Sequence, residues 1–354
     1  MLSIRYIFTT LLPFAAILLL GVLGVASTEP ELLPNQITYY VLALATIFFF
    51  TFVDSSLIKK FSPYFFILVV IFLIAVLVFG ENVRGSVRWF DFGSFRFQPS
   101  ELAKSATIFF LAAFMSAADN ISRKLQIFTS LIIALIPFVL IFIEPDLGSA
   151  MPILLIWFSM IFIKGLQTRY ILFLLIFSII SLPVVWMLLA PYQKERVNTF
   201  LNPTQDPLGA GYAVIQSQIS IGSGEIFGKG LSRGTQSQLN FLPEKHTDFV
   251  FASIAEEVGF IGSFVILLSF LTLVSSFFYY ASKAINTFSV LVLVAGASLI
   301  LFQFFIAIGM NLGILPVTGI TLPFISYGGS SVLSLSLILG VINGIIIQNR
   351  LTKV

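Results

Sequence analysis

The chain has 354 residues, of which 58% are hydrophobic and only 10% are charged, and 40 of them are phenylalanine. A soluble globular domain carries about 25% charged residues, so this sequence lacks the charge to cover a water-exposed surface and is that of a membrane protein. The absence of cysteine excludes a disulfide-stabilised secreted domain. A net charge of +3 spread over this length excludes a nucleic-acid-binding surface.

Apolar stretches long enough to cross a bilayer recur along the whole chain. A hydrocarbon core about 30 Å thick needs roughly 20 apolar residues per helix. We therefore predict one all-α polytopic membrane domain over residues 1–354, with about ten transmembrane helices. The first apolar stretch is longer than the roughly 7–15 residues of a signal peptide, so we expect it to be a retained anchor. The predicted spans are 7–26, 37–53, 62–79, 100–118, 126–143, 148–163, 170–189, 249–280, 286–309 and 325–347.

The basic residues indicate the orientation of these spans. Short segments rich in Lys and Arg stay in the cytoplasm, and an even number of spans puts both termini on one side. The segments on the side of the termini contain Arg5, Lys59, Lys60, Arg123, Lys124, Lys164, Arg169, Lys283, Arg350 and Lys353, against Asp54 and Asp119. We therefore predict cytoplasmic termini and a large extracytoplasmic loop between spans seven and eight, at about 190–247.

A second extracytoplasmic segment, residues 80–99, alternates aromatic and charged residues. Gly93-Ser94 separates its two arms, which predicts a small hairpin with a type II′ turn. The following Pro99 suits the first turn of the next helix. The segment is either an interfacial aromatic belt whose arginines contact lipid phosphates, or part of a substrate site. In the second interpretation Arg88, Trp89 and Arg96 line that site.

Ionisable residues occur at the outer ends of several spans, where they are costly unless they are paired or functional. Glu101 and Lys104 lie on one helix face and can form an ion pair. Asp146 follows Pro145, and can cap the sixth span. His246 and Asp248 precede the eighth span, where Asp248 can likewise be a helix cap, and Glu256-Glu257 lies further along that span. Because all these groups map to the outer half of the membrane, we predict a shared polar cavity open to the outer face.

Several other chemistries are excluded or weakened by the composition. One histidine and no cysteine exclude an H-E-x-x-H zinc protease and a Cys/His metal site. The glycine-rich segment 222–230 resembles a phosphate-binding loop only superficially, because Ser223 and Gly230 occupy the positions of its first glycine and its Ser/Thr. We interpret it as a flexible turn region.

Motifs from about residue 80 to the C-terminus resemble those of the SEDS family (shape, elongation, division and sporulation proteins), and most closely its RodA branch. The RodA-like features are 209–212, 216–217, 228–230 and 234–239. The family motifs are Gln98-Pro99-Ser100-Glu101-Leu102-Ala103-Lys104, Glu144-Pro145-Asp146-Leu147-Gly148, Leu242–Phe251, Ala255-Glu256-Glu257-Val258-Gly259, Gly313–Gly319 and Pro323–Ser331.

This resemblance implies a peptidoglycan glycosyltransferase in the bacterial cytoplasmic membrane, acting on the outer face for cell elongation. It implies lipid II and a growing glycan strand as substrates, with a class B penicillin-binding protein and other elongation-complex membrane proteins as partners. By motif, Asp248 matches the family's essential aspartate, and Glu101, Lys104 and Asp146 match residues of its polar central cavity. Ser326 belongs to the last motif and is expected at the same cavity.

Glycosyl transfer to a hydroxyl needs a base and stabilisation of the departing pyrophosphate. Asp248 is the candidate base. The cations expected at the pyrophosphate are Lys104, Lys245, Arg88 and Arg96, beside His246, or else a Mg²⁺ or Mn²⁺ ion held by Asp248, Glu101 and Asp146. The alternative functions are a lipid II flippase, since buried acids suit transport, and a non-enzymatic membrane scaffold.

Overall fold

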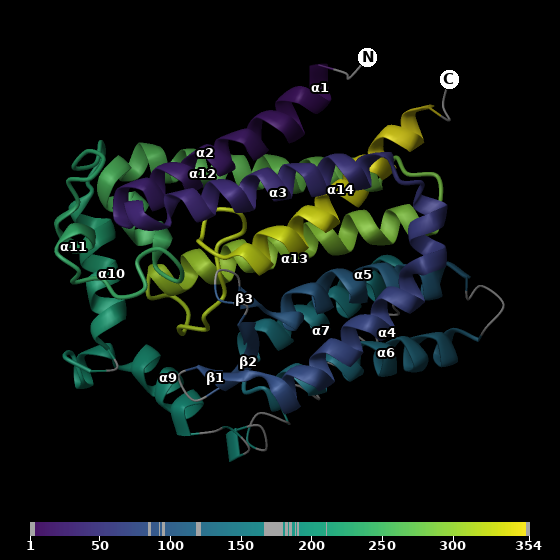
Figure 1. Ribbon diagram of the computed structural model, residues 1–354, viewed down its shortest axis with the longest axis horizontal. Helices are drawn as coiled ribbons and strands as arrows, with labels where there is room; N and C mark the ends of the chain where they lie inside the picture. The colour runs from purple at the N-terminus through teal and green to yellow at the C-terminus, as the bar shows by residue number, and fades with distance from the viewer. Residues whose placement is uncertain are drawn as a thin grey trace.

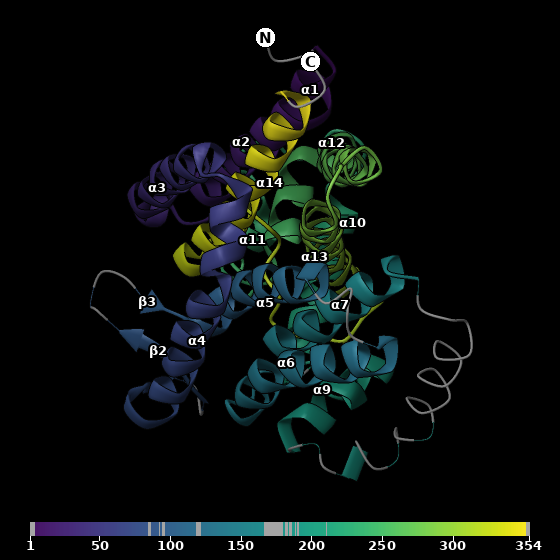
Figure 2. The same cartoon turned by 90° about the vertical axis from the view of Figure 1, so that its right-hand side faces the viewer.

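In the computed structural model the chain folds into a bundle of long helices that lie side by side (Figure 1). Helices α9, α10 and α11 lie at one end of the bundle, and both chain termini lie near each other at the other end (Figures 1 and 2). The structure describes residues 4–83, 86–91, 93, 96–117, 122–165, 180, 183, 186–187, 189, 191–209 and 211–351.

The first half of the chain contains a hairpin between two groups of helices. Its elements are α1 (Ile4–Tyr6), the π-helix η1 (Ile7–Leu11), α2 (Leu12–Thr28), the 3-10 turn η2 (Pro30–Leu32), α3 (Leu33–Phe52), α4 (Ser55–Phe79), β1 (Glu81–Val83), β2 (Ser86–Asp91), β3 (Arg96–Phe97), α5 (Pro99–Ala117), α6 (Arg123–Ile143) and α7 (Leu147–Ile163).

The second half begins with the segment predicted to be the extracytoplasmic loop and continues into the three last spans. Its elements are α9 (Pro191–Leu201), the 3-10 turn η4 (Pro203–Gln205), α10 (Tyr212–Ser223), α11 (Thr235–Gln238), α12 (Val250–Ala281), α13 (Thr287–Asn311) and α14 (Gly329–Leu351).

Each predicted span except that at 170–189 coincides with a described helix, and 170–189 lies almost entirely outside the described residues. Among the described residues, 7 helices are long and apolar enough to cross a membrane, and α7 is an apolar helix of shorter length. The stretch predicted to be a retained anchor forms the η1–α2 span, which packs against α12 at the outside of the bundle.

Burial identifies the centre of the bundle. In the most apolar windows of α13 and α14, 72% and 78% of the residues are buried, whereas the corresponding share in α2, α3, α4 and α6 is 22–28%. The outer helices expose large apolar side chains, as expected where the solvent is lipid. Helix α5 packs against α4, α7, α13 and α14, so its polar first turns enter the centre of the protein.

The hairpin predicted in residues 80–99 is confirmed. Strands β2 and β3 are antiparallel, with Phe90 opposite Phe97 and Asp91 opposite Arg96, and this register places Gly93 in the connection between the two strands. Gly93 has a φ of +80°, which glycine adopts without strain. The type of the turn depends on residues outside the described part of the chain. Strand β1, which pairs with β2, was not predicted.

Helix α12 differs from the prediction of one regular span. Gly259 has φ +66° and ψ −163°, which interrupts the helix within its outer part. A Cβ at Gly259 would lie 2.3 Å from the amide nitrogen of Gly228. Only a glycine fits this position, because another part of the backbone occupies the space of a side chain. The interruption therefore creates a docking position for the extracytoplasmic loop.

Candidate functional site

The segment that carries Asp248 is held by hydrogen bonds to consecutive backbone carbonyl groups. The donors come from α12, from α13 and from the loop before α14, three elements that are distant in the sequence. The bonds run from the Ser253 hydroxyl to the Lys245 oxygen (3.1 Å), from the Tyr327 amide to the His246 oxygen (2.9 Å), from the Ser326 hydroxyl to the Thr247 oxygen (2.7 Å) and from Asn311 Nδ2 to the Asp248 oxygen (2.8 Å). The backbone position of Asp248 is thus fixed before any substrate binds.

Asp248 is not the N-cap of α12. The N-cap is Phe249, and no side-chain hydrogen bond is formed there, so the interpretation of Asp248 as a helix cap is wrong. The side chain of Asp248 is half-buried, and its Oδ2 lies 3.8 Å from the position of a Cβ at Gly319. The absence of a side chain at Gly319 leaves one approach to the carboxylate open.

Asp146 lies at the start of α7 and combines two roles. As the predicted helix cap, its Oδ1 accepts a hydrogen bond from the Ser149 amide at 3.0 Å. Its Oδ2 accepts one from Gln98 Nε2 at 3.2 Å and lies 3.6 Å from Nη1 of Arg88. Arg88 also donates to the carbonyl oxygens of Glu144 and Pro145. Arg88 therefore clamps the turn between α6 and α7 and compensates the charge of Asp146.

Glu101 and Lys104 form the predicted ion pair, with 2.7 Å between Lys104 Nζ and Glu101 Oε2. The side chain of Lys104 is only 2% exposed and that of Glu101 is 9% exposed. The carbonyl oxygen of Glu101 accepts a hydrogen bond from the Ser334 hydroxyl of α14 at 2.6 Å. In a nearly dry interior each charge needs the other, so the pair is a fixed part of the wall between α5 and α14.

Residues 318–334 connect these groups to Asp248. Gly319 faces the carboxylate of Asp248, and the carbonyl oxygen of Thr318 lies where a Cβ of Gly148, two residues after Asp146, would be. Ser330, in the first turn of α14, accepts a hydrogen bond from the amide of Gln98 at 3.1 Å and donates one to the carbonyl oxygen of Arg96. The predicted groups on α5, α7 and α12 therefore surround one segment, although they are far apart in the sequence.

Lys245 has a different role from the expected pyrophosphate cation. It is 6% exposed, and its Nζ donates to Ser237 O at 2.9 Å and to Asn240 Oδ1 at 2.7 Å. Its Nζ also lies 3.2 Å from the carboxylate of Glu29. Lys245 is therefore committed to holding the extracytoplasmic loop against the segment of Asp248. His246 is half-buried, and its ring packs edge-on against that of Tyr327, with 5.9 Å between the two ring centroids.

The two other predicted residues of the hairpin remain on its surface. Trp89 is half-buried on β2, opposite Glu81 of β1. Arg96 is 60% exposed and donates from Nε to Asp91 Oδ2 at 2.9 Å. This hydrogen bond and that of the Gly93 amide hold the pKa of the Asp91 carboxyl below its ordinary value. Arg96 is the one of the predicted arginines that stays open to a ligand.

Glu144, at the end of α6, is a buried acid beside Asp146. It is 1% exposed, and neither carboxyl oxygen has a hydrogen-bond partner within the described part of the chain. Burial first, and then the negative charge of Asp146, raise the pKa of Glu144 to about 8, although Arg88 acts in the opposite direction. At neutral pH this residue is therefore mainly an uncharged acid.

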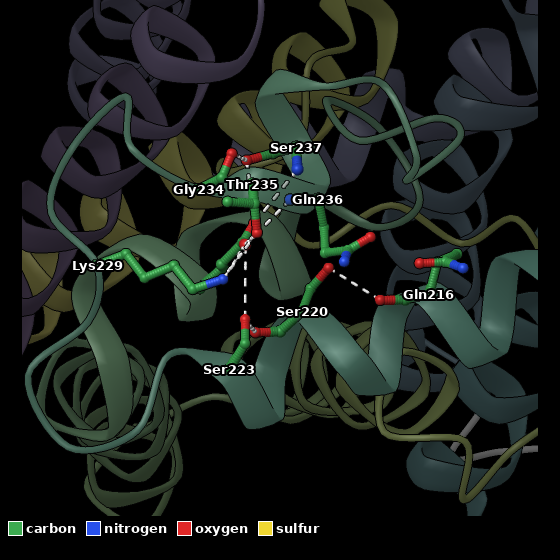
Figure 3. A network of polar contacts seen from close by, with 9 residues as sticks. Gln216, Ser220, Ser223, Lys229, Gly234, Thr235, Gln236 and Ser237 are labelled. Atoms are coloured by element: carbon green, nitrogen blue, oxygen red, sulfur yellow. Dashed lines mark hydrogen bonds and ion pairs between the residues drawn. The ribbon is translucent and has the colours of Figure 1, made fainter.

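Glu256 and Glu257 anchor the extracytoplasmic loop to α12. Figure 3 shows Lys229, Thr235, Gln236 and Ser237 of this loop gathered around one position, that of the Glu256 carboxylate. Glu256 is fully buried. Its carboxylate accepts hydrogen bonds from Lys229 Nζ (2.8 Å), the Gln236 amide (3.0 Å), the Thr235 hydroxyl (3.1 Å), and the hydroxyl and amide of Ser237 (3.2 and 3.3 Å). Glu257 accepts from the Ser27 hydroxyl and from the Ser232 amide. Both acids point to the loop, and each finds its own partners, as their separation of about 100° around a helix requires.

Residues 222–230 include the predicted turn, at 224–227, and hydrogen bonds hold this segment against α12. The amides of Lys229 and Gly230 donate to the carbonyl oxygens of Glu256 and Glu257 at 3.0 Å. In return, the amides of residues 260 and 261 donate to the carbonyl oxygens of residues 225 and 226. These bonds form because the break at Gly259 frees groups that a continuous helix would use internally.

The predicted metal trio is not assembled. No group of three or more His, Asp or Glu side chains suitable for a metal occurs in the part of the chain that the structure describes. Glu101 and Asp146 each already face a cation, Lys104 and Arg88 respectively. A donor set whose charge is already compensated does not fit a resident Mg²⁺ or Mn²⁺ ion.

Two residues of this site were missed by reasoning from the sequence. Asn311, at the end of α13, is 1% exposed. Its Nδ2 donates to the Asp248 carbonyl oxygen, and its Oδ1 accepts from the Ala252 amide. A polar residue at the end of an apolar span was its only signal. Lys229 was placed in a turn, and its signal was a lone basic residue between Gly228 and Gly230, whose φ angles are +78° and +96°.

Comparisons with known proteins support one family. The family model described as "Cell cycle protein", that of FtsW, RodA and SpoVE, matches residues 4–351. The peptidoglycan glycosyltransferase MrdB of Escherichia coli K12 is 37% identical over 342 residues, which are 95% of this chain and 92% of that protein. Stage V sporulation protein E of Bacillus subtilis is 37% identical over 312 residues, 87% of this chain and 85% of that protein.

Solved structures share the fold. A chain from a peptidoglycan synthase complex, studied for its coordination of polymerization and crosslinking, matches with a TM-score of 0.83 at 31% identity, covering 96% of this chain and 97% of that chain. The rod shape determining protein RodA of Thermus thermophilus matches with a TM-score of 0.73 at 28% identity, covering 96% of each chain.

Proposed function

As a member of the FtsW, RodA and SpoVE family, the chain is a peptidoglycan glycosyltransferase, and we propose that it polymerises lipid II with Asp248 as the catalytic base. Its similarity to MrdB and to RodA fits a role in cell elongation. The termini are cytoplasmic, and the reaction takes place on the outer face of the bacterial cytoplasmic membrane. The distribution of basic residues supports this orientation.

The proposed step joins two saccharides. The 4-hydroxyl oxygen of the acceptor forms a bond to the anomeric carbon of the donor disaccharide, and the bond from that carbon to the pyrophosphate oxygen breaks. The hydroxyl proton passes to the carboxylate of Asp248, and the polyprenyl pyrophosphate leaves with the electron pair of the broken bond. A base positioned in this way contributes about 10²–10⁴-fold to the rate.

The observation that carries the proposal is the fixed backbone of residues 245–248. Each of these four consecutive carbonyl groups accepts a hydrogen bond, and the donors come from three elements: α12, α13 and the loop before α14. Preorganisation of this kind removes the reorganisation cost at the moment of reaction. A carboxylate that served only to cap a helix would not need it, and Asp248 is not the cap.

The other charged residues support the reaction from its surroundings. Arg96 has the exposure to contact the pyrophosphate, and a guanidinium suits phosphate recognition. Arg88 and Lys104 instead keep Asp146 and Glu101 compensated at the wall of the site. Since Glu101 and Asp146 are already compensated by cations, a divalent cation would have to arrive with the pyrophosphate of the substrate; unchanged activity in excess chelator would show that the reaction uses none.

The proposed partner is a transpeptidase of the class B penicillin-binding proteins. A peptidoglycan synthase complex that coordinates polymerization and crosslinking contains a chain with the same fold. The transpeptidase that pairs with this chain would receive the nascent glycan strand at the end of the bundle that carries the extracytoplasmic loop and the hairpin (Figure 1).

The test is glycan polymer formation from purified lipid II by the Asp248→Asn variant. We expect no polymer, with unchanged expression and thermal unfolding. The matched control is Asp206→Asn, an exposed acid of the same extracytoplasmic loop, which keeps wild-type activity. Polymer formation by Asp248→Asn at the rate of the control would contradict the assignment.

A further inference from the structure

A cavity of about 300 Å³ lies between the N-terminal helix and α12, away from the proposed reaction site. Its chemistry is unusual for a membrane protein surface, because one guanidinium faces a group of hydroxyls. The lining residues are Arg5, Thr9, Leu271, Thr272, Ser275, Ser276 and Tyr279. We propose that this cavity binds the phosphate of an anionic glycerophospholipid from the leaflet next to the chain termini.

Positive charge dominates the cavity. The guanidinium of Arg5 lies over the ring of Tyr279, 3.7 Å from its centroid, and Nζ of Lys283 lies 5.9 Å from the same centroid. No carboxylate forms an ion pair with Arg5 within the described part of the chain. Stacking on Tyr279 fixes the guanidinium and leaves its donors in the plane of the fork, which suits the oxygens of a phosphate.

The hydroxyls of the cavity divide into two groups. Thr9 donates to the backbone oxygen of Arg5 at 2.8 Å, and Ser276 is bonded to the Thr10 hydroxyl at 3.2 Å, so these residues build the wall. The hydroxyls of Thr272 and Ser275 form no hydrogen bond with the described part of the chain. They are the donors that remain for a phosphate oxygen.

The backbone of this wall is itself irregular. Residues Ile7–Leu11 form a π-helix between α1 and α2, and π-helical turns inside α-helices are frequent at functional sites. The wider turn places Thr9 at the cavity while Thr10 packs inward, where it is 3% exposed. The π-helix therefore supports a binding role for this wall of the cavity.

The surroundings select a lipid over a free ion as the source of the phosphate. Phe8 and Leu12 on the N-terminal helix and Leu268 on α12 are exposed apolar side chains next to the cavity. They provide a surface for acyl chains directly beside the polar headgroup position. The short segments predicted to lie on the side of the termini are rich in Lys and Arg, and each such residue near an anionic leaflet adds to the attraction.

The experiment measures lipid retention by native mass spectrometry of the full-length protein. The protein is purified in detergent and exposed to phosphatidylglycerol, to phosphatidylethanolamine, or to inorganic phosphate alone. The variants are Arg5→Gln and Ser275→Leu, the second of which fills the cavity. The control is Lys124→Gln, an exposed basic residue outside the cavity lining.

We expect phosphatidylglycerol to remain bound to the wild type and to the control, and to be retained about tenfold less by each cavity variant. All variants should still polymerise lipid II, which shows that they are folded. Equal retention by wild type and cavity variants would overturn the proposal. So would equal retention of phosphatidylethanolamine, or displacement of the lipid by inorganic phosphate, which would indicate a simple anion site.

Discussion

Replacing Glu256 with Gln tests whether the buried carboxylate holds the extracytoplasmic loop in place. In the wild type Oε1 faces Lys229, Thr235 and the Gln236 amide, and Oε2 faces the amide and hydroxyl of Ser237. All of these groups except the hydroxyls can only donate. The variant brings an NH₂ group to one of these positions, where it meets donors and accepts nothing.

The smallest cost arises if the NH₂ group takes the position of Oε2. The Ser237 hydroxyl can then turn to accept a hydrogen bond, but the Ser237 amide stays buried without a partner, at about 1–3 kcal/mol. The ion pair with Lys229, which is 29% exposed, adds up to about 1 kcal/mol after solvent screening. We therefore expect a local destabilisation of roughly 1–4 kcal/mol. The lower value is about a fivefold change in the opening equilibrium.

Hydrogen exchange of the amides in residues 229–238 measures this opening directly. In Glu256→Gln the exchange of these amides should accelerate about fivefold or more. The control Glu225→Gln, an exposed acid of the same loop, should leave it unchanged. Polymer formation should fall as well, because Ser237 O holds Lys245. Exchange in Glu256→Gln within twofold of the control would refute the anchoring role.

Further predictions concern stability. Because burial raises the pKa of Glu144 from 4.5 to about 8, the folded chain binds this proton more tightly, so the free energy of unfolding falls by roughly 5 kcal/mol as pH rises through that window. Glu144→Gln should abolish this fall, measured as the unfolding temperature against pH, and parallel curves for the variant and the wild type would contradict this. Lys104→Met leaves Glu101 unpaired and should lower the free energy of unfolding by about 3–5 kcal/mol. The double variant Glu101→Gln with Lys104→Met should recover most of this stability, whereas additive losses in a double-mutant cycle would contradict the pairing. Gly259→Ala places a Cβ 2.3 Å from the amide nitrogen of Gly228 and should lower the free energy of unfolding by about 2 kcal/mol. Limited proteolysis within residues 224–237 should become faster, and unchanged cleavage would argue against docking of this segment on α12.

Much of the fold follows from local patterns. Apolar stretches of span length set the helices, because lipid requires each backbone group to be paired within its own helix. Alternation around Gly93 predicted the hairpin, and Asp146 after Pro145 predicted the cap of α7, both of which depend only on neighbours in the sequence. The predicted pair of Glu101 and Lys104 likewise needs only helical spacing.

The site depended on contacts that no local pattern contains. The sequence around Gly259 predicts a regular apolar helix, because the helix is interrupted by contact with the backbone of Gly228 on another segment. Lys245 looked like a free cation, because its partners Ser237 and Glu29 come from two separate loops. Reasoning from motifs located the groups correctly in the chain, but only the packing shows which of them support the site and which remain open.

The most direct test of the central claim separates chemistry from binding at Asp248. Lipid II affinity and the rate of polymer formation are measured for Asp248→Asn and the wild type under the same conditions. A catalytic base predicts an affinity within about threefold and a rate lower by about 10²–10⁴-fold. A loss of lipid II affinity in Asp248→Asn, with the rate at saturating lipid II unchanged, would contradict the role of Asp248 as the catalytic base.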